Sequence, residues 1–199
     1  MKLSCVALPD EAASEKVQGL MNQYSNECGS VKALAFLPHF SLWGDFEIES
    51  EHFSPLKERL ASIVSDTLPL QVTLQRYGFY PWRIVYLDIE KTDALQKLHT
   101  SAMNAILRYR TQWVPQTLLD SAHFSGKQRQ YIEQFGYQFA GEFYSPHFTL
   151  AGNDMSENDF QALVNKLEQK REYINVRVAK IALVERDSST NTLLWTSET

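Results

Sequence analysis

The sequence predicts an α+β fold made of one duplicated unit, with two pseudo-symmetric lobes in a single domain over residues 1–199. Amphipathic helical segments alternate with short apolar strand segments, and no linker or low-complexity segment divides the chain. A five-residue pattern occurs twice, at 38–42 and 146–150, and each copy is followed by a helical segment and two strand segments. This repeat is typical of a duplicated α+β unit rather than of a doubly wound parallel sheet.

The first half of the chain carries clear local signals. Asp10 is a plausible N-cap for a helix that has Val17 and Met21 on its apolar side. Because Pro38 interrupts the apolar run at 31–42, we expect a strand with an irregular beginning there instead of a helix. The expected elements are a strand at 3–8, a helix at 11–24, the strand at 31–42, a helix at 54–65 and a hairpin of strands 70–79 and 82–89.

The second half repeats this order after a longer connection. The two copies of the pattern are separated by 108 residues, and the segment at 107–134 is expected to be a helical insert over the cleft. The expected elements are a helix at 92–113, a further helical pattern at 127–135, a strand at 145–150, a helix at 154–170 and a hairpin of strands 174–184 and 192–196 around a turn at 187–191.

Composition narrows the class of protein. The chain is 44% hydrophobic and 22% charged, and it has no run of about 20 apolar residues, so no membrane-spanning helix is expected. The N-terminus lacks a secretory pattern, which favours a cytoplasmic protein in which Cys5 and Cys28 are free thiols. A net charge of −5 with scattered basic residues favours a short or mononucleotide-like ligand over a long nucleic acid. We expect a monomer.

The repeated pattern is the informative feature. It reads Pro38-His39-Phe40-Ser41-Leu42 and Pro146-His147-Phe148-Thr149-Leu150, and a glycine follows each copy. Side chains alternate between the two faces of a strand, so His39 and Ser41 share one face while Phe40 and Leu42 point into a core. Packing explains only the phenylalanine and the leucine. The recurrence of a histidine at the same offset therefore indicates a function.

Two imidazoles and two hydroxyls suit the hydrolysis of a phosphodiester. A neutral histidine can take a proton from water while a protonated one gives a proton to the leaving oxygen, because the imidazole pKa lies near neutral pH. His39 and His147 are therefore the expected acid–base pair, with Ser41 and Thr149 as the phosphate ligands. This chemistry needs no metal and no cofactor, and no set of histidines or cysteines with zinc-ligand spacing occurs.

Two His-x-Ser/Thr motifs in a chain of this size resemble the 2H phosphoesterase superfamily, which includes cyclic phosphodiesterases and 2′–5′ RNA ligase-like proteins. The segments at 6–11, 178–187 and 194–195 resemble the cyclic phosphodiesterase branch, and 135–143 resembles a branch linked to phosphonate metabolism. The resemblance implies antiparallel sheets that face a central cleft, with helices outside. It also implies that His39 and His147 are catalytic and that Ser41 and Thr149 bind phosphate.

The expected activity is the hydrolysis of a small cyclic phosphate, either a 2′,3′-cyclic nucleotide or an ADP-ribose cyclic phosphate, to a phosphomonoester. Three alternatives stay open. They are the processing of short 2′–5′-linked RNA, a binding module for nucleotides or RNA that has lost catalysis, and a metal-dependent hydrolase. Resistance to a chelator and the effect of His39→Ala on turnover and on binding distinguish them.

The remaining candidates are expected to have ordinary structural roles. His52, His99 and His123 are expected to be solvated or capping residues. The alternating acidic residues that follow the first motif are expected to form the solvent-exposed face of a strand. Tyr80, Trp82, Trp43 and Tyr144 are candidates for stacking on a base, and Arg76 and Arg83 for contacting a second phosphate, with core packing and surface solvation as the competing interpretations.

Overall fold

A computed structural model describes residues 1–186 and 191–197 of the chain. Its strands all pair in antiparallel fashion. This arrangement confirms the α+β class. The strands are β1 (Lys2–Pro9), β2 (Phe40–Glu47), β3 (Leu70–Tyr80), β4 (Ile84–Ile89), β5 (His147–Ala151), β6 (Arg171–Arg186) and β7 (Asn191–Thr196).

One long strand joins the two halves of the sheet. The strand order is β2-β1-β6-β3-β4-β5, and β7 pairs with β6. The 16-residue strand β6 pairs with β3 through its first half and with β1 through its second half. The two sheets that the sequence predicts are therefore two ends of one hydrogen-bonded sheet, and the motif strands β2 and β5 are its outermost strands.

The helices begin and end where local sequence signals place them. Asp10, Thr92 and Ser156 are side-chain N-caps, as predicted for Asp10. Gly29 and Gly136 end two helices with a positive φ. The α-helices are α1 (Glu11–Cys28), α2 (Phe53–Thr67), α3 (Asp93–Ile106), α4 (Gln116–Leu119), α5 (Gly126–Phe135) and α6 (Glu157–Leu167), and the 3₁₀ helices are η1 (Lys32–Ala35), η2 (Ser50–His52) and η3 (Gly141–Phe143).

The structure corrects three predicted boundaries. The strand expected at 31–42 begins only at Phe40, because η1 and an irregular segment with Pro38 precede it. The helix expected through residue 113 ends at Ile106, and the one expected at 154–170 is limited to Glu157–Leu167. Residues 187–190 of the predicted turn lie outside the described residues.

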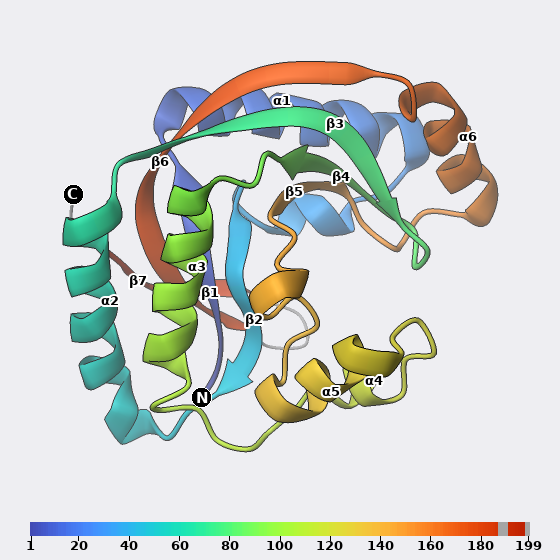
Figure 1. Cartoon of the computed structure of the whole chain (residues 1–199). Coiled ribbons are helices and arrows are strands. Elements are labelled where there is room, and N and C mark those ends of the chain that lie inside the picture. Colours follow the sequence, from blue (N-terminus) through green and yellow to red (C-terminus); the bar gives the residue numbers. More distant parts are fainter. Residues whose placement is uncertain (187–190, 198–199) are drawn as a thin grey trace.

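The sheet curves so that its two outermost strands approach each other. In Figure 1, β3 and β6 arch over the molecule, α2 and α3 stand side by side at one end, and α4 and α5 lie apart from the other helices. The rings of Phe40 on β2 and Phe148 on β5 meet edge to face, with 5.6 Å between their centroids. One hydrophobic core includes both rings. None of the described helices combines the length and apolar character needed to cross a bilayer.

Candidate active site

The two motif histidines occupy matching places at the starts of the outermost strands. His39 directly precedes β2, and His147 is the first residue of β5. In each case Nδ1 lies 2.7 Å from the carbonyl oxygen of the residue two positions earlier, which is Leu37 or Ser145. A carbonyl only accepts hydrogen bonds, so each Nδ1 carries the hydrogen in the neutral imidazole, and Nε2 is left as the basic nitrogen.

The four motif residues line one cavity of about 340 Å³, here called the motif cavity. His39 and Ser41 reach it from the β2 side, and His147 and Thr149 reach it from β5. Alternation along the strands explains this, because Phe40 and Phe148 point the other way, into the core. The structure therefore brings together all four residues that the sequence singles out.

The cavity favours neutral imidazoles in the free protein. Each ring is half-buried, and burial lowers the pKa of His39 to about 4. The positive charge of Arg186 also lowers the pKa of His39, against the opposing effect of its hydrogen bond with Leu37. Burial also lowers the pKa of His147, while its hydrogen bond with Ser145 and the negative charge of Asp88 raise it.

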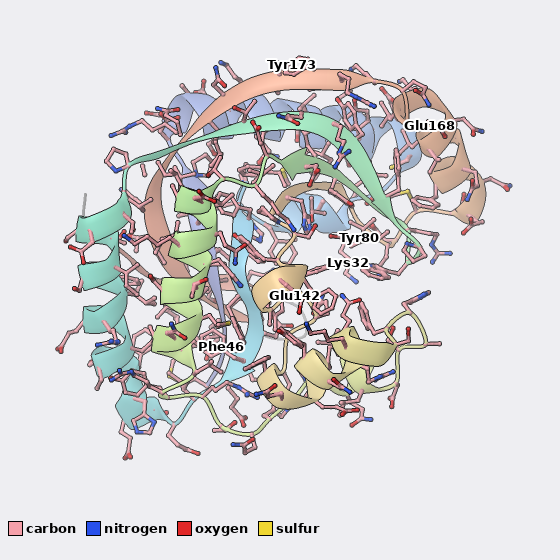
Figure 2. All side chains as sticks on the ribbon, in the orientation of Figure 1. Lys32, Phe46, Tyr80, Glu142, Glu168 and Tyr173 are labelled. Carbon is pink, nitrogen blue, oxygen red and sulfur yellow. The ribbon has the colours of Figure 1, made fainter. Side chains whose placement is uncertain are left out.

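Aromatic rings form the wall around His147. The ring of Tyr86 lies 4.7 Å from the imidazole, and the rings of Tyr80 and Phe139 lie 5.3 Å and 5.9 Å away. Tyr80 also stacks on Trp82 at 4.7 Å, and both residues line the motif cavity, as the sequence suggests for a rim. Figure 2 labels Tyr80 and Lys32, which both belong to the cavity lining.

Trp43, Tyr144 and His99 belong to the core. The prediction that His99 is solvated or capping is wrong, because its side chain is fully buried on α3. Its Nδ1 donates to the carbonyl of Leu42 at 2.9 Å, and its Nε2 accepts from the N–H of Gly141 at 3.2 Å. Burial lowers the pKa of His99 to about 4, so it holds β2 to α3 as a neutral imidazole. His123 is exposed, and His52 is half-buried beside Glu51.

An acidic side chain fixes the segment that leads to His39. Asp154, in the turn after β5, accepts hydrogen bonds from the Ser30 hydroxyl at 2.5 Å and from the N–H groups of Val31 and Lys32 at 2.9 Å. The Ser30 hydroxyl in turn accepts from the N–H of Gly152 at 2.8 Å. These bonds join the start of η1 to the end of the strand that carries the second motif, and so fix the positions of the two motifs relative to each other.

Several lining residues have no clear sequence signal. Tyr137, Lys32 and Arg186 line the motif cavity, as do Pro115, Thr117 and Leu118 from the segment between the motifs. The glycines after the motifs are a hint to two of them, Tyr137 and Lys32. A Cβ on Gly44 would lie 2.5 Å from the ring of Tyr137, and one on Gly152 would lie 2.9 Å from Cβ of Lys32. Both positions thus need a residue without a side chain.

The two arginines that the sequence offers for a second phosphate contact other residues. Arg76 pairs with Asp88 at 3.1 Å, and Arg83 donates to the carbonyl of Asn153 at 3.3 Å. Neither arginine lines the cavity. Within the described ranges 1–186 and 191–197, no three histidine, cysteine or acidic side chains gather as a metal-binding group. Cys5 and Cys28 are buried free thiols.

Comparisons with known proteins identify the family of this chain. The model of the 2′-5′ RNA ligase superfamily matches residues 8–190. A protein of Geobacillus kaustophilus, provisionally named a phosphoesterase, is 28% identical over 116 residues, which are 57% of this chain and 64% of the relative. The match thus spans a little less than two thirds of that relative. A protein of Bacillus cereus with the same provisional name is 26% identical over 147 residues, 69% of this chain and 83% of the relative.

Solved structures share the fold. LigT of Escherichia coli in complex with NADP⁺ has a TM-score of 0.59 and 14% identity, and the alignment covers 100% of this chain and 98% of LigT. The same protein in complex with 3′-AMP has a TM-score of 0.58 and 15% identity over the same shares of the two chains. Identities this low show a common fold and nothing finer. The family match over nearly the whole sequence is decisive, and this chain belongs to the 2′-5′ RNA ligase superfamily of 2H phosphoesterases.

Proposed function

We propose that this protein is a metal-independent phosphodiesterase that opens a small cyclic phosphate to a phosphomonoester. The substrate class is a 2′,3′-cyclic nucleotide or an ADP-ribose cyclic phosphate. One observation carries the proposal. Two histidines line the same cavity, and each is held through Nδ1 by a matching backbone carbonyl, so that each has Nε2 left for proton transfer.

The reaction needs one neutral and one protonated imidazole. The oxygen of a water molecule bonds to phosphorus as one of the two ring P–O ester bonds breaks. The neutral histidine takes a proton from the water, and the protonated histidine gives its proton to the leaving oxygen. Each of these roles typically contributes about 10²–10⁴-fold to the rate. Ser41 and Thr149, on the same strand faces as the histidines, would donate hydrogen bonds to the non-bridging phosphate oxygens.

The surroundings of the two rings favour different roles. The positive charge of Arg186 acts on His39 and disfavours its protonation, whereas the negative charge of Asp88 acts on His147 and favours its protonation. Asp88 and His147 are direct partners in the β4–β5 ladder, so their side chains lie on the same face. We therefore assign the role of general base to His39 and that of general acid to His147.

The size and lining of the motif cavity support a mononucleotide-sized ligand. A volume of about 340 Å³ lies in the lower range of ordinary small-molecule sites. Tyr80 and Trp82 offer aromatic surface to a base at the rim. NADP⁺ and 3′-AMP, which were bound by LigT of E. coli, are both nucleotides.

Processing of short 2′–5′-linked RNA is the second candidate, favoured by the description of the matched family. A protein that follows a longer strand needs a basic track along its phosphates. The lysine and arginine side chains that line the motif cavity are Lys32 and Arg186, and the chain has a net charge of −5. The small cyclic substrate is therefore the better fit.

The test is phosphomonoester production from a panel of 2′,3′-cyclic nucleotides and ADP-ribose 1″,2″-cyclic phosphate, with EDTA present. We expect turnover to survive EDTA and to fall by at least ~10² in both His39→Ala and His147→Ala. His52→Ala removes a histidine outside the cavity lining and is the matched control, with activity expected to equal the wild type.

Binding separates the enzyme from a pure binding module. Titration of each variant with 3′-AMP should give affinities close to that of the wild type, because the proton-transfer groups mainly stabilise the transition state. Turnover that is unaffected by loss of either histidine would refute the mechanism. Tight binding without turnover on any substrate of the panel would favour the binding module.

A further inference from the structure

Arg186, the last residue of β6, lies where two cavities meet. It lines the motif cavity and also a second cavity of about 220 Å³, here called the side cavity. The two linings also share His39, Phe36 and Leu37. The guanidinium therefore stands on the same side of the motif cavity as the first motif, and β6 rather than a motif strand supplies it.

Two contacts hold this guanidinium in place. Its Cζ lies 5.0 Å from the ring centroid of Phe36, in the geometry of a cation–π contact. Its Nε lies 3.4 Å from Oδ1 of Asp45, and Asp45 is itself fixed by a 2.7 Å hydrogen bond from the Ser4 hydroxyl. The side chain is 30% exposed, so it is partly shielded from water but still accessible to a ligand.

The hydrogen-bonding capacity of Arg186 is not used up by these contacts. Among the described residues Nε has no hydrogen-bond partner, because its approach to Asp45 meets the distance for an ion pair but not the geometry of a hydrogen bond. A guanidinium carries five N–H donors in a planar fork. A fork of this kind matches the oxygens of a phosphate. The attraction between the guanidinium and an anion is also stronger where water is partly excluded.

We propose that Arg186 is a third phosphate-binding residue, whose guanidinium contacts a non-bridging oxygen of the reacting phosphate on the His39 side of the motif cavity. This assignment rests on the proposed function and goes beyond its four motif residues. Arg186 would stabilise the negative charge that grows on phosphorus-bound oxygens in the transition state. Its effect on the pKa of His39 agrees with this closeness.

The competing role for Arg186 is structural, through its ion pair with Asp45. Two variants separate the roles. Arg186→Met removes both the phosphate contact and the ion pair, whereas Asp45→Asn removes the ion pair and keeps the guanidinium. A structural role would give both variants the same loss of thermal stability with unchanged phosphate affinity. If Arg186 binds phosphate, Arg186→Met loses phosphate affinity, whereas Asp45→Asn, which keeps the guanidinium beside the ring of Phe36, loses much less.

The first measurement is a calorimetric titration of the apo protein with inorganic phosphate and with 3′-AMP. We expect Arg186→Met to weaken both by at least about tenfold, as for loss of a charged hydrogen bond. Arg186→Lys should recover part of the affinity, because it keeps the charge without the fork. Arg59→Met, on an exposed part of α2, removes one guanidinium elsewhere and should bind like the wild type.

The second measurement uses the cyclic phosphate substrates and the His39 signal in NMR. Arg186→Met should lower kcat/KM by about 10²-fold and should raise the pKa of His39, because the nearby positive charge is gone. If Arg186→Met left phosphate affinity and kcat/KM unchanged, the assignment would be overturned. A loss of kcat/KM confined to substrates with a second phosphate would also overturn it. If the wild type opened no cyclic phosphate and Arg186→Met still lost phosphate affinity, the proposed function would be wrong while the phosphate contact stood.

Discussion

Each motif histidine is restrained through one ring nitrogen, and this restraint decides its chemistry. The Nδ1 hydrogen bonds with Leu37 and Ser145 select one neutral tautomer and fix the plane of each ring. Burial then lowers both pKa values below the ordinary 6.5, so both rings are mainly neutral at pH 7 in the free protein. A bound anion reverses part of this shift, because a negative charge favours the imidazolium.

These pKa shifts predict an acidic optimum for kcat/KM. The base must be neutral, so the rate falls as pH decreases through its lowered pKa, which is about 4 for His39. The acid must be protonated, so the rate falls as pH increases through the lowered pKa of His147. Because kcat/KM reports the free enzyme, its maximum should lie below pH 6.5. The pH optimum of kcat should lie higher, because the bound phosphate raises the pKa values of the two histidines.

Steady-state rates from about pH 3 to 8.5, a range that includes the lowered pKa of His39, check this expectation. A flat kcat/KM that persists well above neutral pH would contradict it. With the roles assigned here, the residual activity of His39→Ala should lose the acidic limb of the profile, and that of His147→Ala should lose the basic limb.

The sequence predicts the motif residues and two aromatic residues of the rim, but not all of their neighbours. His39 and His147 are predictable because repetition at a fixed offset has no packing explanation. Tyr137 and Arg186 reach the motif cavity from segments without any such repeat, and only the curvature of the sheet brings them there. His99 was misjudged because helical periodicity places the residue on α3 but says nothing of the carbonyl and amide that meet its ring.

At the scale of elements, the segment before β2 depends on a contact made far away in sequence. Asp154 accepts three hydrogen bonds from residues 30–32 and so fixes η1 beside the turn that follows β5. Residues from η1 onward form one wall of the motif cavity and lead directly to His39. In the proposed mechanism, the position of the His39 ring therefore depends on these three hydrogen bonds.

We therefore expect Asp154→Ala to reduce both activity and stability. Loss of the acceptor should cost about 1–2 kcal/mol in unfolding free energy, since the bonds are near the surface. It should lower kcat/KM by roughly tenfold or more, because a small misplacement of a catalytic group greatly reduces the rate. Thermal melts and steady-state kinetics measure the two effects, with the exposed Asp66→Ala as the control. If Asp154→Ala and Asp66→Ala behaved alike, the hydrogen bonds of Asp154 would not position His39.

The elements themselves are largely predictable from the sequence, and the strand expected at 31–42 is the main exception. Hydrophobic periodicity and capping residues found the helices α1, α2 and α6 and the hairpin of β3 and β4. The run at 31–42 was predicted as a strand because its apolar residues suggest one. In the structure these residues instead form η1 and the cavity wall, held by Asp154, and such long-range hydrogen bonds leave no local pattern.

At the scale of the whole molecule, β6 makes one sheet out of two repeated halves. Its first half pairs with β3 and its second half with β1, and one core runs beneath both. The repeated motif predicts a duplication, but the continuity of the sheet leaves no comparable pattern in the sequence. Periodicity predicted β6 over 174–184, too short to show that it pairs on both sides.

The shared strand predicts a single cooperative unfolding transition. Leu74→Ala on β3 and Leu183→Ala on β6 remove fully buried side chains from different halves, and each should lower the unfolding free energy by about 2–5 kcal/mol. Tryptophan fluorescence and far-ultraviolet circular dichroism should give coincident urea curves in both variants. Separate transitions for the two probes would instead indicate lobes that unfold independently.

The matching carbonyl contacts of the two histidines have a consequence for product regiochemistry. Because both rings are anchored alike, their carbonyl contacts do not distinguish the two orientations in which a cyclic phosphate can enter the cavity. For the proposed reaction, the choice between a 2′- and a 3′-monoester therefore falls to the unlike walls, with Arg186 on one side and Tyr80 and Trp82 on the other. A change in either wall would then alter the product while all four motif residues stay the same.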